Sequence, residues 1–262
     1  MGHTGIQVQE RGAMRRTISN ILIVVFSAII VISAFRLWKI FHEYRAGEKE
    51  YEETATVFVN TKETGSDRKD TLPQECPITF DFDGLLQKNA DVVGWIYSEG
   101  TQINYPVLRG EDNSLYLNTM ISGEYNPAGS IFMDYRCEPD LSGFNTIIYG
   151  HHMKNGSMFA SLHQYIDQSF YEDHKYMWYL TPEHVYRLDV ISGYIGKAEA
   201  EVYTIFKDLD ELNSYLSFAT LYSDFTPAQV PEEIDRIVAL STCSYEYDDA
   251  RYVVVCVPVM VK

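Results

Sequence analysis

The amino-acid sequence predicts a mainly β protein: a closed eight-stranded barrel with several short peripheral helices, preceded by one N-terminal transmembrane helix. Three observations favour this fold. One long apolar segment without charges lies near the N-terminus, short apolar runs separated by turn residues fill the C-terminal part, and few stretches show helical periodicity. With 262 residues, 46% of them hydrophobic, the chain can form one sizeable core.

The apolar segment begins at Ile18, and its uncharged part reaches Phe35. Together with the residues up to Trp38 it is long enough to span a hydrocarbon layer of about 30 Å. A cleaved signal peptide or a buried core helix is the alternative, but the run exceeds the usual signal-peptide core and no small-x-small cleavage site follows it. Residues 18–38 are therefore expected to form a retained membrane anchor.

Charge predicts how this anchor is oriented. Three basic residues precede it, Arg11, Arg15 and Arg16, so the positive-inside rule places residues 1–17 in the cytoplasm and the rest of the chain outside the cell. Residues 39–75 are polar and charged with little apolar periodicity, which is typical of an extracellular spacer. The folded domain is expected over residues 76–262.

The net charge of the chain is −16, with 21 Lys and Arg against 37 Asp and Glu. The first 45 residues hold six basic and two acidic residues, so the remainder carries about −20. Such a field repels a phosphate backbone, which excludes nucleic acid as a partner. The four cysteines form no CxxC pair and no zinc-type spacing with histidine, so neither a metal nor a cofactor is expected.

Eight apolar runs have the length and β-branched content of strands. They cover residues 93–97, 103–108, 129–133, 145–150, 185–195, 201–206, 236–242 and 251–261. Closure into a barrel would remove the exposed edges of such a sheet. Helices are expected near residues 81–86, where Asp81 or Asp83 can serve as the cap, over residues 157–165, and over residues 209–221.

Cys243 ends one of the predicted strands, and Arg251 opens the next. If the two strands pair as a hairpin, the guanidinium lies beside the end of the cysteine strand, where it can favour a thiolate or stabilise a developing oxyanion. A lone cysteine at a strand end is also often a small structural hydrophobe. The neighbouring arginine favours the chemical interpretation.

Acyl transfer from a thiol also needs a proton donor, and histidine is the usual residue. His151 and His152 follow the predicted strand that ends at Gly150. Alternation along a strand places His151 on the same face as Tyr149 and His152 on the opposite face, so at most one of the two points toward the thiol. The remaining histidines of the chain lie in contexts that favour a surface position.

The runs NTIIYGHHMKNGSMFASL and LSTCSYEYDDARYVVVCVPVMV closely resemble the two signature regions of class B sortases, which are membrane-anchored cysteine transpeptidases of Gram-positive bacteria. The resemblance extends from about Asp81 to Lys262 and includes INYPVLRGEDNSLYL and GSIFMDYR. Histidine, then Thr-Cys, then arginine occur in the order of the family. Ala239 stands where threonine is frequent in the family, a mild departure at a position that we expect to pack inside.

The resemblance implies a catalytic trio of His151, Cys243 and Arg251, acting without a cofactor or a metal. It implies cleavage after the threonine of an LPxTG-like or NPxTx-like signal, a thioacyl-enzyme on Cys243, and transfer to an amine of a peptidoglycan precursor. The partners would be secreted proteins with a C-terminal sorting signal, and the enzyme would act at the cell membrane with its domain outside.

Other residues and other functions stay open at this stage. Candidate substrate-binding residues are the neighbours of the nucleophile, Thr242, Tyr245 and Glu246. Of the other cysteines, Cys256 is expected in the core, whereas Cys76 and Cys137 lie in loop-like sequence where a disulfide is one option. One alternative function is a hydrolytic cysteine peptidase or amidase. It is disfavoured because cysteine precedes histidine in papain-like enzymes, whereas His151 precedes Cys243 in this chain. The other alternative is a non-catalytic extracellular binding module.

Overall fold

The computed structural model describes residues 3–61, 72–197, 203–243 and 249–262, with the side chains of residues 3–19 and 243 outside that description. The chain divides into two units, Met1–Ala46 and Gly47–Lys262. All strands of the described residues belong to the second unit. The elements in chain order are α1 (His3–Phe58), β1 (Val59–Thr61), β2 (Ile78–Phe80), α2 (Phe82–Lys88), β3 (Val92–Tyr97), β4 (Asn104–Leu108), η1 (Leu115–Leu117), β5 (Ile131–Met133), β6 (Asn145–Tyr149), η2 (Ala160–Ile166), α3 (Gln168–Asp173), β7 (Tyr176–Leu180), β8 (Val185–Lys197), α4 (Leu209–Leu221), β9 (Ile237–Cys243) and β10 (Ala250–Met260).

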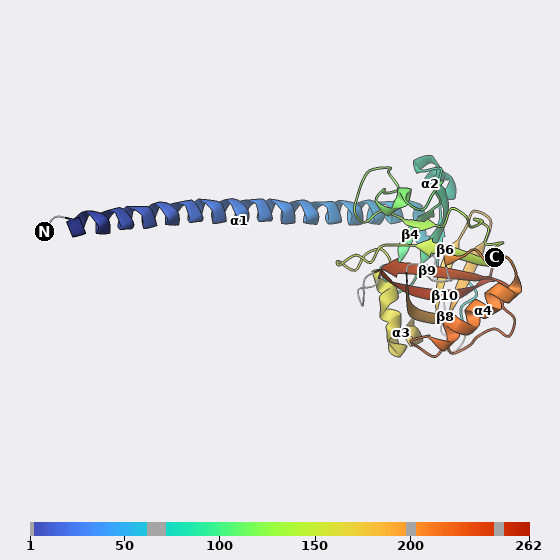
Figure 1. Ribbon diagram of the computed structural model, residues 1–262. Coiled ribbons are helices and arrows are strands. Elements are labelled where there is room, and N and C mark those ends of the chain that lie inside the picture. The colour runs from blue at the N-terminus through green and yellow to red at the C-terminus, as the bar shows by residue number, and fades with distance from the viewer. Residues whose placement is uncertain (1–2, 62–71, 198–202, 244–248) are drawn as a thin grey trace. The chain divides into compact units, whose positions relative to one another are not determined.

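Eight strands close into a barrel in the order β10-β8-β7-β3-β4-β5-β6-β9, and β9 pairs with β10 to complete it (Figure 1). Two neighbouring pairs are parallel, β4 with β5 and β6 with β9, whereas the others are antiparallel. A parallel pair needs a crossover connection, and the chain between β6 and β9 supplies one that contains η2, α3, β7, β8 and α4. The predicted closed barrel of eight strands is confirmed.

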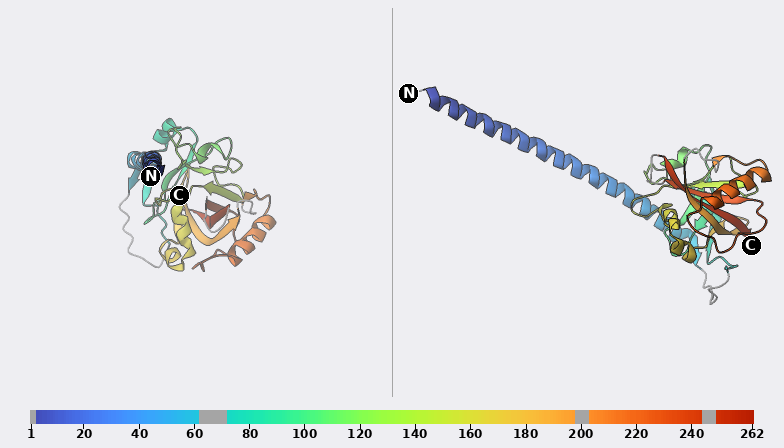
Figure 2. Two further views of the ribbon diagram at one scale, coloured as in Figure 1. Left: turned by 60° about the vertical axis from the view of Figure 1, so that its left-hand side comes forward. Right: turned by 60° about the horizontal axis from the view of Figure 1, so that its bottom comes forward.

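Helix α4 covers one outer side of the barrel, as both views of Figure 2 show for the orange helix. Its buried residues Leu212, Tyr215 and Ala219 pack against alternate residues of β9 and β10, such as Ala239 and Val255. The Asp208 carboxylate caps the helix by accepting a hydrogen bond from Glu211 N at 2.9 Å. The helix predicted over residues 209–221 is present with those bounds, and Asp81 caps α2 as expected.

One predicted strand is absent from the described residues, and one strand of the barrel was not predicted. Tyr203–Phe206, the described part of the predicted strand 201–206, does not form a strand. The side chain of Asn145 takes the place of a partner strand, since its Nδ2 donates to Thr204 O at 2.8 Å and its Oδ1 accepts from Phe206 N at 2.9 Å. The eighth barrel strand is instead β7, an aromatic run that the sequence analysis did not select.

Helix α1 contains the predicted anchor. Among the described residues it is the one helix long and apolar enough to cross a membrane, with a best-window mean hydropathy of 2.5 in the stretch Asn20–Phe58. None of that window is buried within the structure. Length and composition are thus those of a membrane-spanning helix.

The second unit begins earlier than the predicted domain. It starts at Gly47, within the predicted spacer 39–75, and α1 continues to Phe58. The cause is a narrow buried face: Gly47, Tyr51 and Thr54 are buried, at the spacing of one side of a helix. Glycine, tyrosine and threonine among many charges do not form an apolar stripe, so the sequence pattern resembled a solvated spacer.

The cysteines whose side chains are described form no disulfide. Cys76, Cys137 and Cys256 are all buried thiols. Cys256 lies inside β10 with no exposed surface, as expected for a core thiol. The disulfide option between Cys76 and Cys137 does not apply, because the Cys137 sulfur instead accepts a hydrogen bond from Ile147 N at 3.4 Å.

Candidate active site

The three residues predicted to act together come from three neighbouring strands. In the antiparallel pair of β9 and β10, Cys243 lies directly opposite Arg251. In the parallel pair of β6 and β9, Tyr149 lies opposite Ser241. His151 is two residues beyond Tyr149, and Cys243 is two residues beyond Ser241, so both residues lie at the same end of the barrel.

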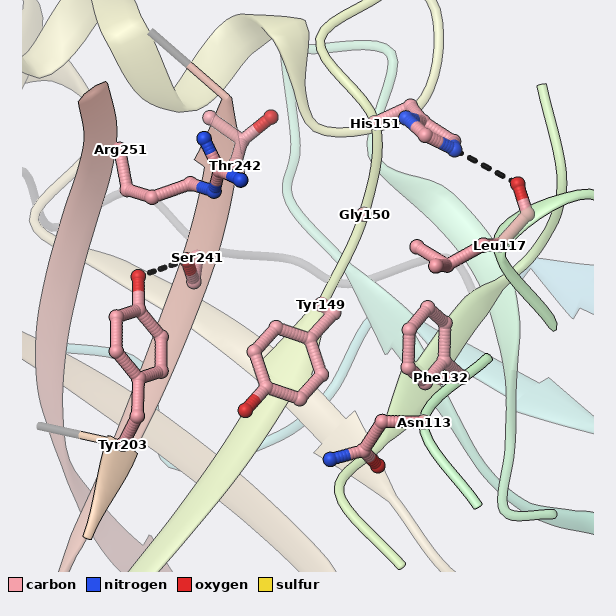
Figure 3. A pocket seen from close by; sticks show the side chains of 10 residues that line it. All are labelled: Asn113, Leu117, Phe132, Tyr149, Gly150, His151, Tyr203, Ser241, Thr242 and Arg251. Carbon is pink, nitrogen blue, oxygen red and sulfur yellow. Dashed lines mark hydrogen bonds between the residues drawn. The ribbon is translucent and has the colours of Figure 1, made fainter. Parts of the chain in front are cut away.

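A pocket of about 270 Å³ opens at these strand ends (Figure 3). Three of the predicted site residues line it, namely His151, Thr242 and Arg251. Tyr245, Glu246 and the Cys243 side chain lie outside the described residues, but the Cys243 backbone is described as the last residue of β9. The other residues lining the pocket are Asn113, Leu117, Phe132, Tyr149, Gly150, Tyr203 and Ser241.

His151 is oriented by a backbone carbonyl. Its Nε2 lies 2.7 Å from Leu117 O, the last residue of η1. Because a carbonyl only accepts, this contact places the proton on Nε2, and Figure 3 shows the other ring nitrogen on the side of Thr242 and β9.

The local sequence explains how His151 reaches this position. A Cβ on Gly150 would overlap Ile131 and lie 2.7 Å from the Phe159 ring, so glycine lets the end of β6 pack closely against both. The backbone then turns, and Phe159 N donates to His151 O at 3.0 Å. The His152 ring is directed elsewhere, since its centroid lies 5.6 Å from that of His163 and the residue does not line the pocket. The predicted separation of the two histidines agrees with this arrangement.

Arg251 and Thr242 form the opposite wall of the pocket. The Arg251 guanidinium donates from Nη1 to Ala250 O at 2.9 Å, and Arg251 and Thr242 both line the pocket (Figure 3). Thr242 is 1% exposed, and its hydroxyl has no hydrogen-bond partner among the residues that the structure describes. The wall therefore presents a planar cation to whatever enters the pocket.

The floor of the pocket is aromatic. The rings of Tyr149 and Tyr203 stack with centroids 6.0 Å apart, and Phe132 lies 5.2 Å from Tyr149. The Tyr203 hydroxyl is hydrogen-bonded to Ser241 Oγ at 2.7 Å, which ties the segment before α4 to β9. An apolar floor with a few fixed polar groups is the usual form of a site for a peptide or small molecule.

One buried carboxylate holds the floor in place. Asp134 accepts hydrogen bonds from Tyr149 OH at 2.9 Å, Asn113 Nδ2 at 2.8 Å and the Arg136 guanidinium at 2.7 and 2.8 Å. Burial alone would raise the pKa of Asp134, but these hydrogen bonds together hold that pKa below its usual value. Arg136 in turn donates to Tyr203 O at 2.9 Å, so one network supports three sides of the pocket.

The comparisons with known proteins agree with this geometry. A family model described as the Sortase domain matches residues 96–259. A curated relative, Sortase B of Staphylococcus aureus, is 34% identical over 249 residues, which cover 94% of this chain and 96% of the relative.

The chain belongs to the class B sortases.

Solved structures support the same assignment. Sortase B from Bacillus anthracis matches with a TM-score of 0.71 and 34% identity, covering 84% of this chain and 100% of that one. A Sortase B solved in complex with triglycine matches with a TM-score of 0.64 and 36% identity over 69% of this chain and 86% of that one. This sortase is accordingly a transpeptidase, as the resemblance implied, and the comparisons support neither of the two alternatives, the hydrolytic peptidase and the binding module.

Sequence analysis missed several parts of the sortase site. Leu117 contributes a carbonyl oxygen, which no side-chain pattern reveals. Asn113 and Tyr203 come from connections far from the signature runs, and Tyr203 lay in a predicted strand. Asp134 is part of the quoted run GSIFMDYR, and an acid that follows an apolar strand is a signal that would have selected it.

The structure holds no group of three or more His, Cys, Asp or Glu placed to bind a metal within the described residues.

Proposed function

We propose that this sortase cleaves an LPxTG-like or NPxTx-like sorting signal after its threonine, through a thioacyl-enzyme on Cys243, and transfers the protein to an amine of a peptidoglycan precursor. The catalytic residues in this proposal are Cys243, His151 and Arg251. The observation that carries it is the strand register, because Cys243 lies opposite Arg251, and His151 lies two residues beyond Tyr149, which pairs with Ser241 of the cysteine strand.

The first half-reaction forms the thioester. The Cys243 thiolate attacks the carbonyl carbon of the threonine, and the negative charge moves to the carbonyl oxygen. Arg251 stabilises this oxyanion with its planar fork of N–H donors. The tetrahedral intermediate collapses, the C–N bond breaks, and His151 donates its proton to the departing amine.

The second half-reaction reverses these roles. The acceptor amine attacks the thioester carbon, His151 takes the proton that the amine loses, and Cys243 leaves as a thiolate. Leu117 O keeps the imidazole in one orientation throughout, a task that a carboxylate performs in other triads. The triglycine complex of the related Sortase B supports a peptide amine as the acceptor class.

The neighbours of the nucleophile are proposed to bind the signal. Thr242 is suited to this task because it lines the pocket. Tyr245 and Glu246 are retained in the proposal on their position in the chain alone. An extended peptide would lie over the aromatic floor formed by Tyr149 and Tyr203, with the threonine carbonyl near Arg251.

The proposed location follows from α1 and its flanking charges. Residues 18–38 would cross the cell membrane once, residues 1–17 would stay in the cytoplasm, and the barrel would lie outside. The apolar stretch of α1 and the basic residues before it, Arg11, Arg15 and Arg16, support this orientation. Secreted proteins with a C-terminal sorting signal would meet the enzyme there.

The test is a cleavage assay with fluorogenic LPxTG-type and NPxTx-type peptides, run with and without triglycine. We expect cleavage of at least one peptide, a transfer product when triglycine is present, and loss of both in Cys243→Ala. Activity that survives in Cys243→Ala would overturn the mechanism. Cleavage without any transfer product would contradict the proposed acceptor class while leaving the thioester step in place.

A further inference from the structure

The last turns of α1 contact the two segments that support His151. Among these residues Tyr51 is 4% exposed although it lies in a strongly charged stretch of sequence. Its hydroxyl donates to Gly129 O at 2.6 Å and lies 2.9 Å from Ser130 Oγ. Burial raises the pKa of Tyr51, so the hydroxyl stays protonated and remains a donor.

Gly129 and Ser130 lie directly against the carbonyl that orients His151. Gly129 has a φ of +55°, and a Cβ at this position would overlap Leu117 O. Ser130 N donates to Tyr116 O at 2.9 Å, which fixes the peptide next to Leu117. A displacement of Gly129 therefore moves Leu117 O, because the two backbones are in van der Waals contact with no side chain between them.

The second supporting segment is the loop after His151. The Tyr51 ring packs edge-on against Tyr105, with centroids 5.3 Å apart, and Tyr105 OH accepts a hydrogen bond from Met158 N at 2.9 Å. Met158 bridges the backbone of His152 and precedes Phe159, which bonds to His151 O. Tyr51 thus contacts Gly129 and Ser130, which lie against the partner of the His151 ring, and Tyr105, which holds the loop that supports the His151 backbone.

Exposed contacts hold the same turns of α1 in place. The Glu50 carboxylate accepts hydrogen bonds from Ser122 N at 2.9 Å and Ser122 Oγ at 3.0 Å. Glu48 accepts one from Asn155 Nδ2 at 2.6 Å, in the loop that follows His151. Helix α1 is continuous from the apolar stretch to these residues, so the element that carries the anchor also touches the support of the site.

We propose that Tyr51 is a positioning residue for His151, and that the end of the anchor helix thereby sets the catalytic competence of the barrel. The inference rests on the proposed catalytic role of His151. Loss of the Tyr51 hydroxyl would let Gly129 relax and would lengthen the contact between Leu117 O and the imidazole. The substrate pocket itself would keep its walls, since Tyr51 does not line it.

The test uses the full chain in detergent micelles and compares Tyr51→Phe with the wild type. A misplacement of about 1 Å in a catalytic group can cost ~100-fold in rate, and we expect a loss of about tenfold in kcat with KM within about twofold. The basic limb of the pH profile of kcat/KM should move to lower pH, because a weaker contact with Leu117 O lowers the pKa of the His151 imidazolium. The other ionisable residues around His151, namely Tyr149, Tyr203, Arg251 and Cys243, are unchanged in this variant.

Tyr125→Phe is the matched control, because it removes the same phenolic hydroxyl from a residue that is 71% exposed. It should behave as the wild type. Glu50→Gln is a second test that does not touch the core, and it should shift the pH profile in the same direction by a smaller amount. A Tyr51→Phe variant with lower thermal stability but unchanged kcat and pH profile would overturn the inference, as would a change confined to KM.

His151→Ala is measured in parallel to separate the two proposals. If His151→Ala is inactive and Tyr51→Phe and Glu50→Gln match the wild type, only the role of Tyr51 fails. If His151→Ala keeps the wild-type rate, the proposed mechanism fails and the inference falls with it.

Discussion

Replacement of Asp134 by asparagine tests the claim that one buried carboxylate organises the pocket. The substitution keeps the shape of the side chain and removes its charge. Three donors converge on Oδ2, from Tyr149, Asn113 and Arg136, and two more from Arg136 converge on Oδ1. Whichever way the asparagine amide turns, its NH2 group faces donors that it cannot satisfy.

The magnitude follows from these contacts. Hydrogen bonds to a charged group contribute ~1.5–3 kcal/mol each, and removal of one partner of a buried ion pair costs ~3–5 kcal/mol. The lower end of these energy ranges applies, because the Arg136 side chain is 39% exposed and water can replace part of the interaction that its guanidinium loses. We expect a loss of about 3 kcal/mol in the free energy of unfolding, which corresponds to a Tm decrease of roughly 6–12 °C for a unit of this size.

The pH dependence makes this prediction specific. The pKa of Asp134 is lowered in the folded state, so its contribution is complete above the unfolded pKa of about 3.9 and is lost as the pH falls through the lower, folded pKa. The difference between wild type and Asp134→Asn should therefore be large at pH 7 and should shrink progressively below about pH 4.

The assay is urea unfolding of the full chain in detergent, followed by the fluorescence of the buried Trp95 and Trp178 at pH 7 and at pH 3. A difference below ~1 kcal/mol at pH 7 would refute the central role of the carboxylate. An equal difference in the free energy of unfolding at both pH values would refute the claim that the ionised form of Asp134 provides the stabilisation. The m-value should be the same for both proteins, because the extent of burial does not change.

The remaining predictions concern the catalytic residues and the buried thiols. Arg251→Lys should lower kcat/KM by about 100-fold although the charge is kept, because the planar fork is lost; unchanged kcat/KM would exclude contact with the reacting carbonyl. His151→Ala should abolish peptide cleavage, whereas His152→Ala should retain most of it, and the reverse ranking would reassign the histidine. Burial raises the pKa of the Cys137 thiol to about 11 and that of Cys256 as well, so iodoacetamide at pH 7 should leave both unmodified in the native protein, as peptide mapping would show.

The barrel was predictable because its strands carry their own signals. Turn residues separate short β-branched runs, and the alternation around Tyr149 predicted that His151 shares its face, which agrees with both residues lining the pocket. The exchange of the predicted strand 201–206 for β7 shows the limit of such patterns, since both runs are aromatic, and the Asn145 amide occupies backbone groups of Thr204 and Phe206 that a strand partner would otherwise use.

The site was predictable where side chains carry the chemistry and hidden where the backbone does. Arg251 next to a strand-end cysteine is visible in the sequence, but Leu117 O is not, because any residue supplies a carbonyl. The packing of Tyr51 was hidden for a different reason. A single tyrosine among glutamates has no periodic apolar partners, so only the tertiary fold reveals that it is buried.

The central claim is that Cys243 forms a thioester with the threonine of a sorting signal. Its most direct test is intact-mass spectrometry of the full chain after incubation with the best-cleaved peptide in the absence of an amine. We expect a mass increase equal to the acyl fragment, which hydroxylamine removes and which triglycine discharges as a transfer product. The absence of the adduct from an active enzyme, or its persistence in Cys243→Ala, would contradict the account.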